Sequence, residues 1–402
     1  MSDVEKNIGT HKPQFDGEWV RLGDVIKKAK SARCGSDSYP ILSITMRDGI
    51  VEQASRFKKS IASRDTGNYK VVEPGQLVVG FPIDEGVIYV QNFNYPGIMS
   101  PAYDVWDIDS SRVDPSYLEL ALHSPQSMDY YRSNLRGTTA RRRSLPTNTL
   151  CDLTFPLPSL ENQRIVVKRM SMIATLLDNA GSRLSALDDL VKSRFVEMFG
   201  DPIEQPKYQT ESLGEACTKI GSGATPRGGK TIYMDNGTPF IRSLNVHNGT
   251  FIRKNLAYIG EEEAKKLSNV SLKRGDVLLN ITGASVARSC VLPDDLVGGR
   301  VNQHVAILRA NQSVILPCIL NATLTSESYQ RFMLEGAQKA GATREAITKQ
   351  DLERFRVSIP PLSLQQQFAD FVAKVDKLGF DVQQQIEKLE TLKQSLMQEY
   401  FG

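Results

Sequence analysis

The segments best suited to hold a ligand are two loops of small and basic residues. One is Gly137-Thr138-Thr139-Ala140-Arg141-Arg142-Arg143, and Gly341-Ala342-Thr343-Arg344-Glu345 takes the equivalent place later in the chain. An arginine on such a loop can reach a phosphate, or it can donate two hydrogen bonds to guanine in the major groove. The plainer interpretation is a run of charge on a solvated surface. We predict that both loops contact duplex DNA.

A third loop resembles a phosphate-binding loop without its essential parts. Gly221-Ser222-Gly223-Ala224-Thr225-Pro226-Arg227 has no Lys-Ser/Thr pair at Walker spacing, and it lacks the third glycine of a dinucleotide fingerprint. Lysine would supply the charge that holds a nucleotide's outer phosphates. The loop therefore predicts no bound nucleotide cofactor.

Residues able to carry catalysis are scattered. The four histidines are widely separated, and the chain has no HExxH, GxSxG or zinc-ligand cluster. Asp294-Asp295 resembles a nuclease carboxylate pair, but no Glu-x-Lys follows in a strand-like context. The Asn-Pro-Pro-Tyr type of tetrapeptide, with which amino-methyltransferases hold a base, is also missing. We predict no catalytic residue and no metal site.

An internal repeat must position these loops. Phe155-Pro156-Leu157-Pro158-Ser159-Leu160-Glu161-Asn162-Gln163 recurs as Ile359-Pro360-Pro361-Leu362-Ser363-Leu364-Gln365-Gln366-Gln367. Each block opens a helix-like stretch, and the two stretches end in Phe199-Gly200 and Phe401-Gly402. Solenoid units repeat every 20–50 residues or so, and this period is far longer. The chain is therefore predicted to be a duplicated module of globular head plus helix.

Both stretches have the apolar spacing of a coiled-coil seam. The spacing predicts helices over 160–199 and 364–400 that pair antiparallel, with Ser159 and Ser363 as N-caps. Gly181 and Gly379 are able to kink them. The alternative is that each helix packs only on its own head. The predicted seam positions are Val166, Met170, Ile173, Leu177, Ala180, Leu184, Leu187 and Val191, then Phe368, Phe371, Val375, Leu378, Val382, Leu389, Leu392 and Leu396.

The heads share a framework. Val20-Arg21-Leu22-Gly23-Asp24 matches Ser212-Leu213-Gly214-Glu215, and the turn and strand of 73–79 match those of 273–279. Short apolar runs alternate with helical stretches over 117–135 and 316–340, which is typical of α+β heads. Because the sequences diverge between the shared points, we predict one fold with two different targets.

Composition sets broad limits. The 402 residues are enough for two or more cores, and 24% charged with 40% hydrophobic residues is typical of soluble proteins. No apolar run could span a bilayer, and the polar N-terminus lacks a signal peptide's apolar segment. Five scattered cysteines indicate reduced thiols. We expect a cytoplasmic protein, and a net charge of +3 neither requires nor excludes nucleic acid.

Several of these motifs together resemble the specificity (S) subunits of type I restriction–modification systems. The resemblance rests on the block 155–163 with its second copy 359–367, on Trp19-Val20-Arg21-Leu22-Gly23-Asp24, and on Gly223-Ala224-Thr225-Pro226 with 275–283. Ser100-Pro101-Ala102-Tyr103 and Asn302-Gln303-His304-Val305 look like two variants of one motif from that family's target recognition domains. The resemblance to the family extends over nearly the whole chain after about residue 18. Asn162 and the triple arginine depart from the family pattern.

The resemblance implies two α+β target recognition domains joined by two long antiparallel coiled-coil helices in a pseudo-twofold repeat. It divides the chain into a tail (1–18), domain 1 (19–155), a central helical region (156–205), domain 2 (206–358) and a distal helical region (359–402). The candidate DNA-binding residues are Thr138, Thr139, Arg141, Arg142, Arg143, Thr225, Arg227, Arg242, Thr343 and Arg344.

It also implies a non-catalytic subunit in which each head reads one half of a bipartite, asymmetric DNA site. The helices would set the spacing and dock two methyltransferase (M) subunits, which use S-adenosylmethionine. Motor-nuclease (R) subunits would add restriction with ATP and Mg²⁺, so this chain itself would bind no cofactor and no membrane. The competing interpretations are a self-contained methyltransferase or nuclease, and a two-headed coiled-coil scaffold that binds protein or RNA.

Overall fold

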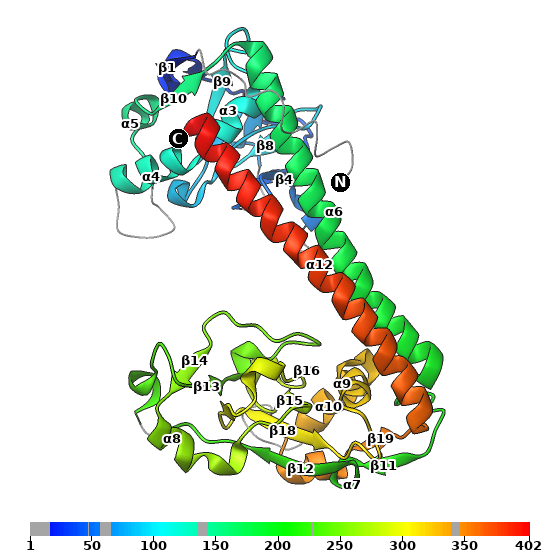
Figure 1. Cartoon of the computed structure of the whole chain (residues 1–402). Helices are drawn as coiled ribbons and strands as arrows, with labels where there is room; N and C mark the ends of the chain where they lie inside the picture. The colour runs from blue at the N-terminus through cyan, green and yellow to red at the C-terminus, as the bar shows by residue number, and fades with distance from the viewer. Residues whose placement is uncertain (1–16, 47, 57–65, 136–143, 227, 339–345) are drawn as a thin grey trace. The chain divides into compact units, whose positions relative to one another are not determined.

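The chain forms two compact units in the computed structural model, which describes residues 17–46, 48–56, 66–135, 144–226, 228–338 and 346–402. Unit 1 comprises Met1–Gly181 with Gln384–Gly402, and unit 2 comprises Ser182–Gln383. Each unit therefore holds one globular α+β head and one half of each long helix (Figure 1).

Unit 1 is built around a four-stranded antiparallel sheet. The strands of the whole unit are Glu18–Arg21 (β1), Ile26–Lys28 (β2), Leu42–Ile44 (β3), Ile50–Glu52 (β4), Lys70–Val72 (β5), Leu77–Val79 (β6), Ile88–Val90 (β7), Gly97–Met99 (β8), Asp104–Ile108 (β9) and Thr154–Leu157 (β10). The main sheet has the order β2-β9-β6-β7, and β1-β10, β3-β4 and β5-β8 form separate pairs. Its helices are Gln53–Arg56 (α2), Pro115–Leu122 (α3), Pro125–Asn134 (α4) and Thr147–Cys151 (α5).

Unit 2 repeats this plan. Its strands are Thr210–Ser212 (β11), Cys217–Ser222 (β12), Thr238–Ile241 (β13), Ala257–Ile259 (β14), Asp276–Asn280 (β15), Ser289–Val291 (β16), Arg300–Val301 (β17), Val305–Ala310 (β18) and Arg356–Ser358 (β19). The main sheet has the order β12-β18-β15-β16, beside the pair β11-β19 and a smaller sheet β14-β13-β17. Its helices are Leu213–Ala216 (α7), Glu261–Lys266 (α8), Pro317–Thr325 (α9), Glu327–Gln338 (α10) and Lys349–Arg354 (α11).

The predicted match between the turns and strands of 73–79 and 273–279 is confirmed. Each turn leads into the strand that stands third in the order of its main sheet, β6 in unit 1 and β15 in unit 2. Each contains a glycine with positive φ, +81° at Gly75 and +79° at Gly275. Gln76 Oε1 accepts from the Glu73 amide at 2.8 Å, and Asp276 Oδ2 accepts from the Lys273 amide at 2.7 Å. The same turn is thus closed by two different side chains.

The two predicted helical stretches are helical, and each consists of two helices. The stretch 117–135 is divided into α3 and α4 at Ser124, and 316–340 is divided into α9 and α10 at Ser326. Ser124 is extended because Pro125 follows it, and its side chain caps α4 by accepting from the Ser127 amide. Ser326 is extended at the matching place, and its hydroxyl bonds back to the Thr323 carbonyl at 2.8 Å.

The two long helices are Leu160–Phe199 (α6), which matches the prediction, and Leu362–Phe401 (α12), which begins earlier than predicted. Ser159 caps α6 by accepting from the Asn162 amide at 3.3 Å. The prediction that Ser363 caps α12 is wrong. Pro361 precedes the helix and its carbonyl accepts the first helical bonds, so Ser363 already lies inside the first turn. Both helices run without a break through Gly181 and Gly379.

Buried glutamines fix the true register of the repeat. Gln163 and Gln365 are both fully buried, and each donates from Nε2 to a proline carbonyl just before its helix, at 2.8 Å to Pro158 and 2.7 Å to Pro360. These pairs, like Phe199 and Phe401, differ by 202 positions. The two blocks that look alike in the sequence, 155–163 and 359–367, differ by 204 positions. The likeness in sequence is therefore displaced by two residues from the positions that the fold makes equivalent.

Within each unit the helix halves pack antiparallel, as predicted. In unit 1 Val166 and Met170 near the start of α6 share a core with Met397 and Tyr400 near the end of α12. In unit 2 Phe195 and Phe199 near the end of α6 contact Phe368 near the start of α12. One predicted seam position is wrong, since Leu378 is 53% exposed. The seam positions on either side of it, Val375 and Val382, are buried as predicted. An ideal helix drifts against a strict heptad repeat, so a single position can turn out of the seam.

The helix pair of unit 2 contains a like-charge contact. Burial, and then the neighbouring Asp188 carboxylate, raise the pKa of Asp376 above its ordinary value of 3.8. A raised carboxyl pKa destabilises the fold at every pH above that pKa, and this cost disappears as the pH falls to the ordinary value. We expect Asp376→Asn to raise the melting temperature at pH 7 and to have no such effect near pH 3.8. Asp381→Asn on the same helix is the control, and equal gains from both variants at pH 7 would contradict the assignment.

All five cysteines are free thiols, in agreement with the sequence. Among the described helices, none has the length and apolarity that a membrane crossing requires.

Candidate nucleic-acid interface

In each unit, motifs singled out in the sequence lie at one end of the strands of the main sheet: 100–103 in unit 1, and 221–226 with 302–305 in unit 2. The central strand, β9 or β18, starts there, and its antiparallel neighbours end there. We call this side the turn edge; it comprises 28–30, 79–82 and 100–104 in unit 1, and 221–226, 280–285 and 301–305 in unit 2. The two turn edges are equivalent places on equivalent sheets.

The same tight turn opens the central strand in both units. The Ala102 amide donates to Ser100 Oγ at 3.3 Å, and the His304 amide donates to Asn302 Oδ1 at 3.1 Å. This matches the two sequence variants that resemble one family motif. The turn presents Pro101 and Ala102 in unit 1, where unit 2 has Gln303 and His304. One scaffold therefore carries different side chains at its exposed tip.

Four polar side chains form a hydrogen-bonded chain at the turn edge of unit 2. Thr282 Oγ1 lies 2.5 Å from His304 Nδ1, and His304 Nε2 lies 3.0 Å from Gln303 Nε2. The Thr225 hydroxyl donates to Gln303 Oε1. Thr225 and Gln303 are exposed, and the other two are half-buried. These hydrogen bonds join three loops that are distant in the sequence.

Gly223 allows the loop of Thr225 to lie against this turn. Its amide donates to the Asn302 carbonyl at 3.1 Å. A Cβ at this position would lie 1.7 Å from the Val301 carbonyl oxygen, closer than any contact allows. The glycine that suggested a phosphate loop therefore serves close packing between two loops.

The residues that follow the second basic loop lie at the same edge. Thr343 and Arg344 lie outside the described residues, but Ala346 pairs with Thr282, and the Ile347 amide donates to the Ile281 carbonyl at 2.9 Å. The residues that follow the loop are thus fixed at the end of β15, next to the polar chain.

The turn edge of unit 1 is cationic and aromatic. Lys28 forms an ion pair with Asp104 at 3.0 Å, and Lys70 donates to the Tyr103 carbonyl. Burial lowers the pKa of Lys70, an effect that Asp104 opposes and the positive Arg33 and Lys28 reinforce. Phe81 is exposed beside Tyr103, with ring centroids 5.4 Å apart. Such a surface suits phosphates and stacked or apolar base surfaces.

Two of the ten predicted DNA-binding residues are among the described ones. Thr225 lies at the turn edge, as described above. Arg242 follows β13, but its guanidinium donates to the Asn255 carbonyl and lies 5.1 Å from the centroid of the Tyr233 ring, so its contacts are internal. The other eight lie outside the described residues: Thr138, Thr139, Arg141, Arg142, Arg143, Arg227, Thr343 and Arg344.

The sequence reasoning missed Gln303, His304, Lys28 and Lys70 as site residues. The first two lie within a motif that marks the family without showing which of its side chains face a ligand. The two lysines lie in no local pattern, since only the pairing of β2 with β9 brings Lys28 to Asp104.

The carboxylate pair that resembled a nuclease site is neutralised. Arg253 holds Asp295 with bonds of 2.8 and 2.9 Å, and Arg274 lies 3.1 Å from Asp294. Within the described part of the chain, no group of three or more His, Cys, Asp or Glu side chains could hold a metal ion.

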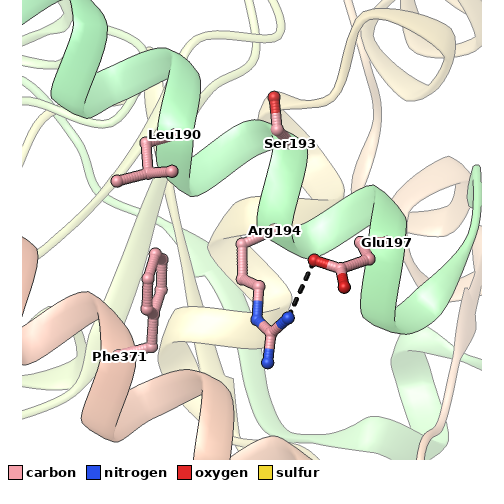
Figure 2. Close-up of a pocket in the computed structure, with 5 residues that line it drawn as sticks. All are labelled: Leu190, Ser193, Arg194, Glu197 and Phe371. Atoms are coloured by element: carbon pink, nitrogen blue, oxygen red, sulfur yellow. Dashed lines mark hydrogen bonds and ion pairs between the residues drawn. The ribbon is translucent and has the colours of Figure 1, made fainter.

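A second surface lies on the helix pair of unit 2 (Figure 2). A shallow pocket is lined by Leu190, Ser193, Arg194, Glu197 and Phe371. Arg194 pairs with Glu197 at 2.8 Å and lies 6.0 Å from the centroid of the Phe371 ring, and Leu190 is 48% exposed.

Three of these lining residues recur at the matching positions of α12 in unit 1. Leu190, Ser193 and Glu197 become Leu392, Ser395 and Glu399. The positions that match Arg194 and Phe371 are Leu396 and Arg169, so these two lining residues are not repeated. Packing gives no reason for the serine and glutamate identities, because all four of these side chains are exposed. Leu392, unlike the exposed Leu190, is half-buried and packs against the core of unit 1. We call the two triplets the repeated helix faces.

The two units thus have equivalent turn edges with different side chains. Comparisons with known proteins show which class of protein has this arrangement. Residues 206–391 match the type I restriction modification DNA specificity domain. The MjaVIII specificity subunit of Methanocaldococcus jannaschii is 23% identical, with 95% of this chain and 91% of that protein aligned. The EcoBI specificity subunit of Escherichia coli is 19% identical over 82% of this chain and 73% of its own length.

Solved structures show the same fold. A chain from a study of type I restriction–modification complex assembly and conformational transition has a TM-score of 0.54 at 20% identity, covering 97% of this chain and 99% of its own. The type I S subunit from M. genitalium has a TM-score of 0.56 at 13% identity, with 98% of each chain covered. This chain belongs to the specificity subunits of type I restriction–modification systems.

Proposed function

We propose that this chain is the non-catalytic, sequence-reading subunit of a type I restriction–modification complex, in which each unit reads one half of a bipartite DNA site. The single observation that carries the proposal is the pair of equivalent turn edges with different side chains. Base edges are read by donors, acceptors and apolar groups in the grooves. Because unit 1 presents cations and aromatic rings and unit 2 presents a polar chain, the two half-sites differ. The alternative, a scaffold for protein or RNA, has no support among the relatives.

We also propose that two identical M subunits dock on the repeated helix faces. Two copies of one partner need two similar surfaces, and an exposed serine and an exposed glutamate recur at the same spacing on the two faces. The M subunits would supply S-adenosylmethionine chemistry, because methylation requires a base to be extruded into an enzyme pocket. R subunits would bring ATP and Mg²⁺ for restriction. The complex would act on cellular DNA in the cytoplasm.

The test is a methylome measurement. The chain is expressed with its M subunit in a host without DNA methylation, and the chain and the M subunit are also expressed separately. We expect an asymmetric motif with two defined halves and an unspecified spacer, and methylation only when both proteins are present. Methylation by the chain alone, a palindromic motif, or an M subunit that methylates the same motif without this chain would contradict the proposal.

Phosphate contacts at the turn edge of unit 1 are testable by salt dependence. We expect the double change Lys28→Ala with Arg33→Ala to weaken DNA binding by similar factors on all sequences. The slope of log affinity against log salt should fall by about one for each cation that no longer binds a phosphate. Titrations of the chain with its M subunit between about 50 and 200 mM salt measure this. Lys192→Ala on α6 is the control, and an unchanged slope in the double variant would exclude binding of phosphate by these two side chains.

Charge reversal tests the repeated helix faces. We expect Glu197→Lys to leave one M subunit bound per chain, Glu399→Lys to leave one, and the double variant to leave none. A reversed charge facing a complementary surface costs several kcal/mol, whereas both glutamates are exposed and contribute little to folding. Mass measurement of the assembled complex gives the stoichiometry. Glu390→Lys is the control, because Glu390 lies on the opposite side of α12 from Glu399. Two M subunits bound to the double variant would contradict docking at these faces.

A further inference from the structure

An exposed amide held on both of its atoms is the most unusual feature of the turn edge of unit 2. Gln303 lies at the exposed tip of the turn before β18. Its Oε1 accepts from the Thr225 hydroxyl, and its Nε2 is 3.0 Å from His304 Nε2. A free glutamine side chain loses up to about 2 kcal/mol of rotamer entropy when a ligand orders it. Here that ordering has happened before any ligand arrives.

The partners allow two matched sets of hydrogen bonds, and both hold the amide. With Thr225 as donor to Oε1, the amide nitrogen faces His304 and donates to its Nε2. In this arrangement His304 carries its proton on Nδ1 and donates a hydrogen bond to Thr282 Oγ1, 2.5 Å away. Reversing the amide, together with the histidine tautomer and both hydroxyl hydrogens, also matches every donor to an acceptor. In either orientation the Gln303 amide is held on both of its atoms.

The held amide keeps the capacity to read a base. A glutamine amide has two N–H donors and two acceptor lone pairs, and the network uses one of each. One donor and one acceptor remain on adjacent atoms. In the major groove adenine presents the complementary pair, an N7 acceptor beside an N6 donor, and glutamine is one of the two side chains that match it with two bonds.

We propose that Gln303 reads an adenine in the half-site of unit 2, and that His304 and Thr225 are positioning residues that hold its amide. The inference rests on the proposed function and adds to it the base and the residue that reads it. Unit 1 has Pro101 and Ala102 at the equivalent positions, neither of which can make this contact. This contact is therefore specific to unit 2.

The test selects sequences from a randomised duplex library with the full chain bound to its M subunit. We expect the wild type to require adenine at one position of the unit 2 half-site. Gln303→Ala should reduce discrimination there about 10- to 100-fold, and every other position and the unit 1 half-site should stay unchanged. Gln303→Glu, whose carboxylate accepts from cytosine N4, should shift preference at that same position toward cytosine.

The positioning role has its own readout. His304→Ala should relax the same position alone, and His304→Gln, whose side-chain oxygen can accept from the Gln303 amide, should restore discrimination. A residue that served only the fold would lower the melting temperature and weaken all positions together. If Gln303→Ala relaxes a base other than adenine, relaxes all positions equally, or relaxes none, the proposal is overturned. Loss of sequence preference in the wild type would instead contradict the proposed function, so the two failures are distinct.

Discussion

Replacing Arg309 by methionine is expected to lower the free energy of unfolding of unit 2 by about 3–5 kcal/mol, because it leaves a buried carboxylate without its counter-charge. The side chain of Asp276 is 0% exposed and that of Arg309 is 19% exposed. Arg309 donates to the two carboxylate oxygens at 2.7 and 2.8 Å, and it also donates to the Ser271 carbonyl at 3.1 Å. In the variant the Lys273 amide would still donate to this carboxylate, but no positive charge would face it.

This ion pair joins β15 to β18, the two strands that end and begin at the turn edge, so its removal should also loosen the polar chain of unit 2. Urea unfolding gives the energy, and amide hydrogen exchange in β15 and β18 shows where the destabilisation occurs. The double change Asp276→Leu with Arg309→Met should recover most of the stability, since it removes both charges together.

Unit 1 supplies the matched control. Its equivalent contact joins Gln76 Nε2 to Asp107 Oδ1 at 2.7 Å, and Asp107 is exposed. We expect Gln76→Met to cost about 1 kcal/mol, because solvent reaches the carboxylate that it leaves. Equal destabilisation by Gln76→Met and Arg309→Met would show that burial of the charge is not the cause.

The long helices were predictable because their signal is long and local. A heptad-like apolar pattern continued over many turns leaves few alternatives, and a serine after proline marked the start of α6 within the same few residues. The start of α12 was less predictable. A proline can occupy the position before a helix as well as a serine can, and only the backbone bonds of Pro361 decide between them.

The turn edges were predictable as loops but not as sites. Glycine and small polar residues indicated where loops lie, and the duplicated motif indicated that the two turns are equivalent. Which side chains meet depends on strand pairing across the sheet, and Thr225, Thr282 and Gln303 are brought together from three separate loops. No local pattern encodes such a meeting. The arginine-rich loops chosen from the sequence lie outside the described residues, so their role stays a prediction.

Replacing Gln365 by methionine should unfold the start of α12 in unit 2 at a cost of about 3 kcal/mol, since unpaired buried donors and acceptors cost about 1–3 kcal/mol each. Gln365 is fully buried, accepts from the Leu316 amide at 2.8 Å and donates to the Val314 carbonyl at 2.9 Å. Together with its bond to Pro360, it fastens the first turn of the helix to the segment before α9. Methionine has a similar volume but can replace none of these bonds.

The repeat makes this prediction specific to one unit. Gln163 accepts from the Asp114 amide at 2.7 Å and donates to the Arg112 carbonyl at 3.0 Å, each 202 positions before its counterpart. Gln163→Met should therefore speed amide exchange at Asp114 and leave Leu316 protected, and Gln365→Met should do the reverse. Gln366→Met, on an exposed neighbour, should change neither. If either buried variant left both amides protected, these glutamines would not be what fastens helix to head, and the register of the repeat would need another physical basis.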